Sequence, residues 1–577
     1  MALKLGDILV EKKIITLDEL KTAIKEQQKT GEMLGQVLVR MGFVAERKML
    51  EVLAEQQGIP FMDLKEATIN DRAIRSIPAK FAWHYKIMPI EVESNVLTVA
   101  ISNPFDMWPI DDLETNLGYR VDKVLATSSD IQEAIKKYYG VGADTIERIL
   151  ADEPRPSEES GGAGKEKVED LEKMAESASV IKLVNQILQQ AINDRATDIH
   201  IEHFRAELLL RYRVDGILYD AQVSENIRYL HPAIVSRIKI MSGLDIVERR
   251  LPQDGRAKVK IGENTFELRV SVIPTLYGEN IAIRILPTTM LFNMSDLGMS
   301  KKDLEMVDKL ILKPHGIIFV TGPTGSGKTT TLYACLSKLN TRERKIITIE
   351  DPIEYELKGI SQTQINPKIN LTFAKMLRSM LRHDPDIMMV GEVRDFETAE
   401  ITIQTALTGH LVFSTVHTND AASGITRLID IGVEPYLISS SVNAFIAQRL
   451  VRVICDNCKE KVKISAKEYI RKQQAAAGKN EKSKYENPPA GKEITVYHGK
   501  GCDACNNTGY RGRTGIYEIL MVNEEIKKLI LQKMPSDMIK EKAVKMGMHT
   551  LREDGWNKIL AGITTPEEVM RVTQAEE

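Results

Sequence analysis

Gly322-Pro323-Thr324-Gly325-Ser326-Gly327-Lys328-Thr329 is the stretch that decides the fold of this chain. Its G-x-x-x-x-G-K-[ST] spacing lies between an apolar run, 316–320, and a helix-like run, 330–339. A glycine-rich loop between a buried strand and a helix directs backbone N–H groups and a helix N-terminus at phosphate. We expect Lys328 to reach the β- and γ-phosphates of ATP and Thr329 to hold Mg²⁺. The predicted nucleotide-binding residues are Gly322, Pro323, Thr324, Gly325, Ser326, Gly327, Lys328, Thr329 and Thr330.

Length and charge narrow the class of protein. A chain of 577 residues is too long for one core and suggests three or four domains. Its 78 basic and 81 acidic side chains nearly cancel, and only 5% of residues are aromatic, so nucleic acid is not the expected substrate. The N-terminus has no apolar signal segment, and no run of about 18 apolar residues occurs. We therefore expect a cytoplasmic protein that associates with a membrane only through partners.

The sequence divides into four regions. Residues 1–150 form an N-terminal module, 151–178 a polar, Gly/Pro-rich flexible linker, 179–290 a middle domain and 291–577 the nucleotide-binding domain. In the first region, Leu5-Gly6-x-x-Leu9-Val10 recurs 29 residues later as Leu34-Gly35-x-x-Leu38-Val39, which indicates a duplicated helical unit. A strand at 97–102 and a helix at 129–138 predict that this module ends as an α/β region.

In the last region, helical segments alternate with short apolar strands at 317–320, 346–349, 387–390 and 411–415. This alternation predicts a largely parallel sheet with helices on both faces. Ligands bind at the carboxyl ends of strands in such sheets, which is where Glu350 and Glu392 fall. Either acid could orient Mg²⁺ or act as the general base. His410 and His417 bracket the last strand, and we expect them near the γ-phosphate.

Four of the five cysteines form two C-x-x-C pairs, Cys455/Cys458 and Cys502/Cys505, with 43 residues between Cys458 and Cys502. Four thiolates leave no open coordination position, so the pattern predicts structural zinc in a subdomain at about 450–520. The Lys/Ala/Gly/Pro-rich insertion at 472–492 would loop out to let the pairs meet. The fifth, Cys335, is expected to serve packing.

Longer motifs resemble one family. The segments 351–355, 381–395 and 408–421 are similar to the Asp box, Walker B and His box of the secretion ATPase superfamily, which drives type II secretion and type IV pilus assembly. Further similarity lies in 196–202, 251–256 and 269–279, so the resemblance covers about 180–577. It implies a RecA-like ATPase core, a PAS-like α+β middle domain, a homohexamer and an inner-membrane assembly protein as partner. One departure is His383, where the family usually has glutamine.

The resemblance also assigns arginines. It marks Arg269 and Arg284, together with Arg256, as groups that approach the nucleotide when the middle domain closes. A cation supplied by another domain or subunit stabilises the charge that develops during phosphoryl transfer. We therefore expect Arg269 and Arg284 to complete the catalytic set with Glu350, Glu392 and His417.

The N-terminal repeats resemble the module, named MshEN, that binds cyclic di-GMP in some secretion and pilus ATPases. The family pattern begins each repeat with arginine, whereas this chain has Lys4 and Met33, and Lys13 replaces a glycine of the first repeat. Loss of a planar, bidentate cation weakens recognition of phosphate or guanine. The sequence therefore favours docking to a membrane partner over cyclic di-GMP binding.

Together these features predict an ATP-hydrolysing hexameric motor that powers type II secretion pseudopilus assembly at the inner membrane. Segments 424–437 and 547–556 resemble the type II ATPase more than the pilus extension ATPase, which stays the alternative within the family. A nucleic-acid translocase is the alternative from another class, because RecA-like sheets also drive helicases. A nucleotide sensor without hydrolysis is disfavoured by the presence of Lys328, Thr329 and Glu392.

Overall fold

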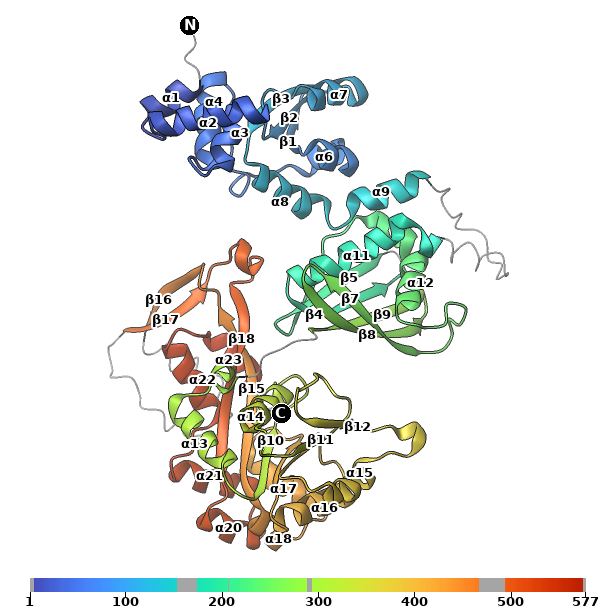
Figure 1. Cartoon of the computed structure of the whole chain (residues 1–577), viewed down its shortest axis with the longest axis vertical. Coiled ribbons are helices and arrows are strands. Elements are labelled where there is room, and N and C mark those ends of the chain that lie inside the picture. Colours follow the sequence, from blue (N-terminus) through green and yellow to red (C-terminus); the bar gives the residue numbers. More distant parts are fainter. Residues whose placement is uncertain (1–4, 153–173, 206, 288–292, 466–492, 574–577) are drawn as a thin grey trace. The chain divides into compact units, whose positions relative to one another are not determined.

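A computed structural model describes residues 5–152, 174–205, 207–287, 293–465 and 493–573 (Figure 1). The chain divides into two compact units, Met1–Ile261 with Glu267–Ile285 and Gly262–Phe266 with Leu286–Glu577. Most of the predicted linker and all of the 472–492 insertion lie outside the described residues. Within the described ranges, no helix has both the length and the apolar character needed to cross a membrane.

Two similar pairs of helices open the first unit, and their bounds are α1 (Leu5–Glu11), α2 (Leu17–Thr30), α3 (Leu34–Arg40) and α4 (Glu46–Gln57). α3 begins 29 residues after α1 (34 − 5), and α4 begins 29 residues after α2 (46 − 17), which confirms the duplicated helical unit. A Cβ on Gly6 would lie 2.6 Å from Leu20 Cδ1, and one on Gly35 would lie 3.1 Å from Met49 Sδ. The two glycines thus allow the helices of each pair to pack closely.

The module continues as an α/β region, as predicted, with α5 (Asp71–Ser76), α6 (Ala79–Tyr85), β1 (Met88–Glu93), β2 (Val96–Ile101), α7 (Trp108–Leu117), β3 (Arg120–Leu125), α8 (Ser128–Tyr139) and α9 (Ala143–Asp152). The sheet order is β1-β2-β3; β1 runs antiparallel and β3 parallel to β2. Helix α8 begins where Thr127 accepts a hydrogen bond from the Asp130 N–H, a side-chain N-cap.

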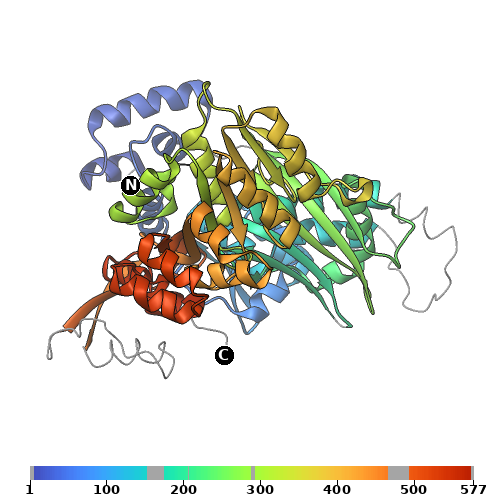
Figure 2. The same ribbon diagram turned by 90° about the horizontal axis from the view of Figure 1, so that it is seen from below.

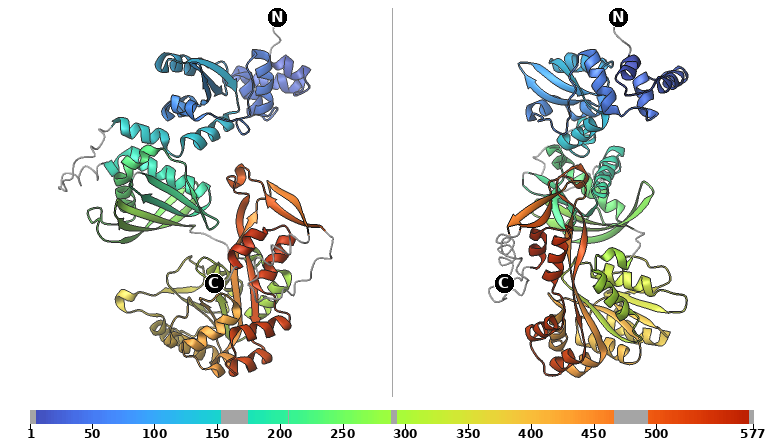
Figure 3. Two further views of the ribbon diagram at one scale, coloured as in Figure 1. Left: turned by 180° about the vertical axis from the view of Figure 1, so that it is seen from behind. Right: turned by 90° about the vertical axis from the view of Figure 1, so that its left-hand side faces the viewer.

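The rest of the first unit is an α+β domain with a six-stranded sheet in the order β6-β5-β4-β9-β8-β7 (Figure 3). Helix α11 buries Val180, Leu183, Ile187 and Ala191, a spacing of three to four residues that forms one apolar face. Its resemblance to a PAS domain stays a prediction. The elements are α11 (Ala178–Asn193), β4 (Ala196–His203), β5 (Leu208–Val214), β6 (Ile217–Asp220), η1 (Glu225–Leu230), α12 (His231–Met241), β7 (Gln253–Ile261), β8 (Asn264–Thr275) and β9 (Gly278–Pro287).

The second unit is built on a seven-stranded sheet in the order β12-β11-β13-β14-β10-β15-β18 (Figures 1 and 2). The first six strands are parallel, and β18 runs antiparallel to β15, so the largely parallel sheet is confirmed. The strands are β10 (Gly316–Thr321), β11 (Ile346–Glu350), β12 (Ser361–Gln364), β13 (Ile387–Val390), β14 (Leu411–Val416), β15 (Val442–Ile454) and β18 (Tyr510–Met521).

Helices cover both faces of this sheet, so alternate residues of a strand pack into two different hydrophobic cores, one on each face. Ile317 and Phe319 join the core with α15, α16 and α17, whereas Ile318 and Val320 join the core with α13 and α14. The elements of this region are η2 (Met294–Leu297), α13 (Lys301–Ile311), α14 (Lys328–Leu339), η3 (Pro367–Ile369), α15 (Phe373–Met380), η4 (Leu381–His383), α16 (Phe396–Leu407), α17 (Ala421–Asp430) and α18 (Pro435–Ser441).

Within its described residues, the C-terminal part adds a β-ribbon and four α-helices. β16 pairs antiparallel with β17, and the helices from residue 524 onward agree with the helical pattern of the sequence after Val522. The bounds are β16 (Lys459–Ser465), β17 (Glu493–Gly499), η5 (Asp503–Cys505), α20 (Glu524–Leu531), α21 (Ser536–Lys545), α22 (Leu551–Leu560) and α23 (Pro566–Thr573).

Candidate nucleotide-binding site

The glycine-rich loop leaves the end of β10 and enters α14 at Lys328, as the sequence predicts. Gly325 and Gly327 have φ values of 80° and 89°, which a residue with a Cβ adopts only with strain. Lys328 Nζ donates to the carbonyl oxygens of Gly322 and Pro323 at 2.8 and 3.0 Å. Ser326 Oγ is buried and has no hydrogen-bond partner among the described residues. The loop therefore offers a cation, an unpaired hydroxyl and a helix N-terminus to one ligand, which fits a phosphate chain.

Strand β15 supports the loop from behind, a contribution that the sequence did not reveal. A Cβ on Gly322 would lie 2.6 Å from Gln448 O, and one on Gly327 would lie 2.7 Å from Gln448 Nε2. Gln448 Oε1 also accepts a hydrogen bond of 2.6 Å from Thr331 Oγ1 in α14. The available signal was Gln448-Arg449, a polar pair that interrupts the apolar run of the strand.

Glu392 lies beside this loop with Lys328 and His417. Its side chain is 11% exposed, and Oε2 is 2.7 Å from Arg394 Nε and 3.3 Å from His417 Nε2. Burial lowers the pKa of Lys328 to about 8, which the Glu392 charge opposes. Burial and the Lys328 charge lower the pKa of His417. The lysine, the acid and the histidine therefore form one electrostatic cluster at the end of the sheet.

Glu350 is the last residue of β11, and its carboxylate accepts hydrogen bonds from other residues of the protein. The residue is 3% exposed and accepts hydrogen bonds from Thr348 Oγ1 at 2.6 Å, from Gln362 Nε2 at 3.1 Å and from the Tyr333 hydroxyl. Burial raises the pKa of Glu350, and these hydrogen bonds oppose that shift. The structure thus differentiates two acids that the sequence left equivalent.

The two histidines lie at opposite ends of β14. His417 directly follows the strand and contacts Glu392, whereas His410 precedes it and its Nδ1 lies 3.0 Å from the Thr405 carbonyl oxygen. The expectation that both lie near the γ-phosphate is wrong for His410, because the two ends of one strand reach opposite edges of the sheet.

A cavity of about 320 Å³ adjoins Glu392. Its apolar side comes from the segment after β12 and the start of α15, and its polar side from the residue after β11, the turn after β13 and the start of α16. The lining residues are Asp351, Ile365, Pro367, Leu371, Thr372, Phe373, Ala374, Glu392, Arg394, Asp395, Glu397 and Thr398.

The predicted arginines lie in the first unit. Arg269 is on β8, and Arg284 on β9 is 3.0 Å from Asp198 Oδ1 through its Nε. Arg256 on β7 lies 3.7 Å from Glu267 Oε1. The role of these arginines at the nucleotide loop stays a prediction.

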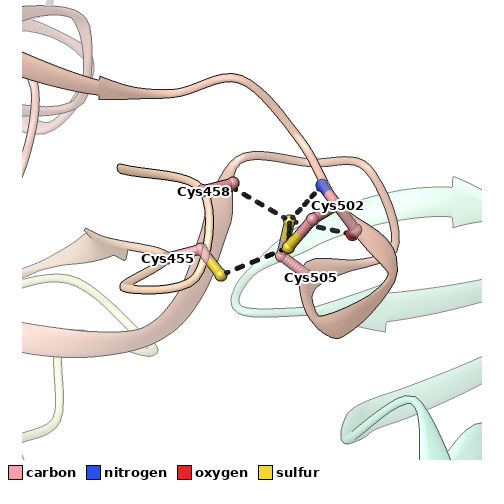
Figure 4. Close-up of side chains that lie close together, drawn as sticks. All are labelled: Cys455, Cys458, Cys502 and Cys505. Atoms are coloured by element: carbon pink, nitrogen blue, oxygen red, sulfur yellow. Dashed lines mark hydrogen bonds between the residues drawn. The ribbon is translucent and has the colours of Figure 1, made fainter. Parts of the chain in front are cut away.

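The four predicted cysteine ligands converge (Figure 4). The Sγ atoms are 3.8 Å apart for Cys455 and Cys502, 3.9 Å for Cys458 and Cys505, and 3.7 Å for Cys502 and Cys505. A tetrahedral site with Zn–S bonds of about 2.3 Å has sulfur–sulfur edges of about 3.8 Å, whereas a disulfide bond is about 2.0 Å long. The arrangement of the four thiols is therefore compatible with a closed zinc site. Cys335 is 2% exposed in the core around α14, where packing was predicted.

Comparison with known proteins matches this architecture. The sequence model of the family described as type II/IV secretion system protein matches residues 173–571, and that of the MshEN domain matches residues 57–145. The chain is 41% identical to the type IV pilus assembly ATPase PilB of Myxococcus xanthus over 575 residues, 99% of both proteins. It is 40% identical to the type II secretion system protein E of Xanthomonas campestris over 581 residues, 99% of this chain and 98% of the relative. The protein of that name from Pseudomonas aeruginosa is 48% identical over 409 residues, 71% of this chain and 78% of the relative.

Proposed function

The chain belongs to the type II/IV secretion system protein family, and from this premise we propose how its site hydrolyses ATP and what the hydrolysis drives. It is an ATPase that powers type II secretion. The pilus extension ATPase is the alternative, supported by the pilus relative that matches this chain along its whole length. The protein acts as a homohexamer in the cytoplasm, held at the inner membrane by an assembly protein that its N-terminal module binds.

One observation carries the catalytic proposal: Lys328, Glu392 and His417 meet at the glycine-rich loop. Lys328 and the backbone of the loop bind the β- and γ-phosphates, and Thr329 holds Mg²⁺, which neutralises charge on the phosphate oxygens. Glu392 is the general base that orients the attacking water, because it is the acid that contacts His417 and whose charge acts on Lys328. His417 holds the Glu392 carboxylate in place.

Glu350 has a supporting role in this proposal. Its three hydrogen bonds from Tyr333, Thr348 and Gln362 fix the end of β11, and its burial disfavours the charged form that a base requires. Arg269 and Arg284 complete the site in the ring when the middle domain closes. The charge they contribute acts mainly in the transition state.

Zinc is proposed at Cys455, Cys458, Cys502 and Cys505, because the sulfur separations fit a tetrahedral ion. The metal would join the start of β16 to η5, two segments that are separated by more than forty residues of sequence. It is structural, since four thiolates leave no position for water or substrate.

For the N-terminal module we favour a docking role over cyclic di-GMP binding. Gly6 and Gly35 are needed for packing against Leu20 and Met49 of the module itself, so their small size does not require a ligand. The arginines that begin the repeats in the resembling family are replaced by Lys4 and Met33. The preference for a protein partner therefore rests on both the packing and the missing arginines.

Steady-state hydrolysis by the full chain tests the proposal. Wild-type protein should require Mg²⁺, and Lys328→Ala should lose nucleotide binding and turnover because it removes the cation from the phosphate loop. Stimulation by DNA would instead favour the nucleic-acid translocase. Undiminished hydrolysis by Lys328→Ala would refute the assignment of the site.

A further inference from the structure

Residues 418–421, which are the loop that follows His417 and the first residue of α17, are each held by a different element. Thr418 donates its N–H to Thr321 Oγ1 at 3.1 Å, at the end of β10. The carbonyl oxygen of Asn419 accepts a hydrogen bond of 2.7 Å from Arg449 Nη2 of β15. These two anchors come from the strands beside the phosphate loop.

The other two anchors come from the C-terminal part of the chain. Asp420 Oδ2 lies 3.0 Å from Lys540 Nζ of α21. The N–H of Ala421 donates to Glu518 Oε1 of β18 at 3.0 Å. Neither Lys540 nor Glu518 belongs to the phosphate loop, the acidic strand ends or the histidine segment, so no motif of the sequence pointed to them.

Lys540 and Glu518 also interact with each other. Lys540 Nζ is 3.8 Å from Glu518 Oε2, and Glu518 is 1% exposed and accepts a further hydrogen bond of 3.4 Å from the Leu551 N–H. Lys540 thus lies between two carboxylates, those of Asp420 and Glu518. Removal of the Lys540 ammonium group would leave the Asp420 and Glu518 carboxylates close together without a cation. Because both side chains are largely shielded from solvent, their repulsion would be strong.

We propose that Lys540 and Glu518 are positioning residues for ATP hydrolysis, which act by fixing the loop that orients His417 against Glu392. This inference rests on the proposed roles of those two residues. His417 Nε2 is 3.3 Å from Glu392 Oε2, so a small displacement of the loop breaks the contact. Misplacement of a catalytic group by about 1 Å costs on the order of 100-fold in rate. The helices after β18 are therefore part of the hydrolytic machinery through α21.

The test uses the full chain and compares two lysines of α21. Lys540→Met should lower kcat by about 10- to 100-fold and change the KM for ATP by less than about threefold, because the phosphate loop is untouched. Lys540→Arg should restore most of the rate. Lys542→Met is the matched control, since Lys542 pairs with Glu525 at 3.2 Å with both side chains more than 40% exposed. Glu518→Gln, which keeps an oxygen for the Ala421 N–H, should lower kcat less.

A double-mutant cycle shows whether Lys540 acts through His417. In the His417→Ala background, Lys540→Met should change kcat by less than about twofold, since the contact that it disturbs is already gone. Effects that multiply would overturn the inference, as would wild-type kcat in both Lys540→Met and Glu518→Gln. A wild-type chain that hydrolyses no ATP would contradict the proposed function instead. Thermal melting of each variant identifies loss of the fold, and a variant that melts like wild type with reduced kcat supports positioning.

Discussion

Exchanging each of the two strand-end acids for its amide decides which one is the base. Glu392→Gln keeps the size of the side chain but removes the charge that faces Arg394 at 2.7 Å and His417 at 3.3 Å. General-base catalysis contributes about 10²- to 10⁴-fold, and each tenfold step is about 1.4 kcal/mol of activation free energy, so we expect a loss of about 3 to 6 kcal/mol. The loss should appear in kcat, with nucleotide binding nearly unchanged.

Glu350→Gln should behave differently. Its carboxylate accepts three hydrogen bonds inside the protein and is 3% exposed, so the amide would disturb folding by about 1 to 3 kcal/mol. We expect kcat to fall less than about tenfold. Phosphate-release assays with saturating ATP measure kcat, and thermal melting measures stability. Glu305→Gln, at an exposed position of α13, is the control variant. A Glu350→Gln variant that loses all turnover beside a fully active Glu392→Gln would reverse the assignment.

Three further predictions address the metal, the middle domain and the arginines. Elemental analysis should find one zinc per chain, and Cys455→Ser should release it and lower the melting temperature, because a closed site contributes folding energy; stable, zinc-free wild type would refute the site. Burial lowers the pKa of His231 from 6.5 to about 4, so this histidine is protonated at a lower pH in the native state than in the unfolded state. The free energy of unfolding should thus fall by up to about 3 kcal/mol as pH decreases from 6.5 to 4. His231→Gln, measured by urea unfolding at several pH values, should reduce this dependence of stability on pH. An unchanged dependence would contradict the assignment of the effect to His231. Arg269→Ala and Arg284→Ala should lower kcat far more than ATP binding; loss of binding by folded variants argues against a transition-state role.

Periodicity and motif spacing were sufficient to predict the main elements. The 29-residue offset of Leu5-Gly6 and Leu34-Gly35 anticipated the two helix pairs, because one helical unit repeated in sequence repeats in structure. The apolar runs before the phosphate loop and before Glu392 anticipated β10 and β13. Sequence also placed Glu350 and Glu392 at the same edge of the sheet, since parallel strands end together.

The different roles of Glu350 and Glu392 could not be predicted in this way. The hydroxyl of Tyr333 and the amide of Gln362 decide the environment of Glu350, and neither is near it in sequence. A strand-end acid has the same local signature whether its neighbours bury it or leave it against a loop. Whether the acid is buried depends on α14, which carries Tyr333, and on the edge strand β12, which carries Gln362.

Distance along the sequence also explains why Lys540 and Glu518, the C-terminal anchors of the loop after His417, could not be predicted. Glu518 lies 97 residues beyond Ala421, and Lys540 lies 120 residues beyond Asp420. In the sequence Glu518 is one acid in an apolar strand, and Lys540 is one of several lysines on an amphipathic helix. A buried acid requires a partner, because an unpaired charge in a core is costly, so Glu518 inside β18 was a signal that some donor must reach it. The antiparallel pairing of β15 with β18 places Glu518 opposite Ala447, and the hydrogen bond from the Ala421 N–H shows that one donor comes from the segment after His417, so contacts between distant elements connect the C-terminal part to the nucleotide-binding site.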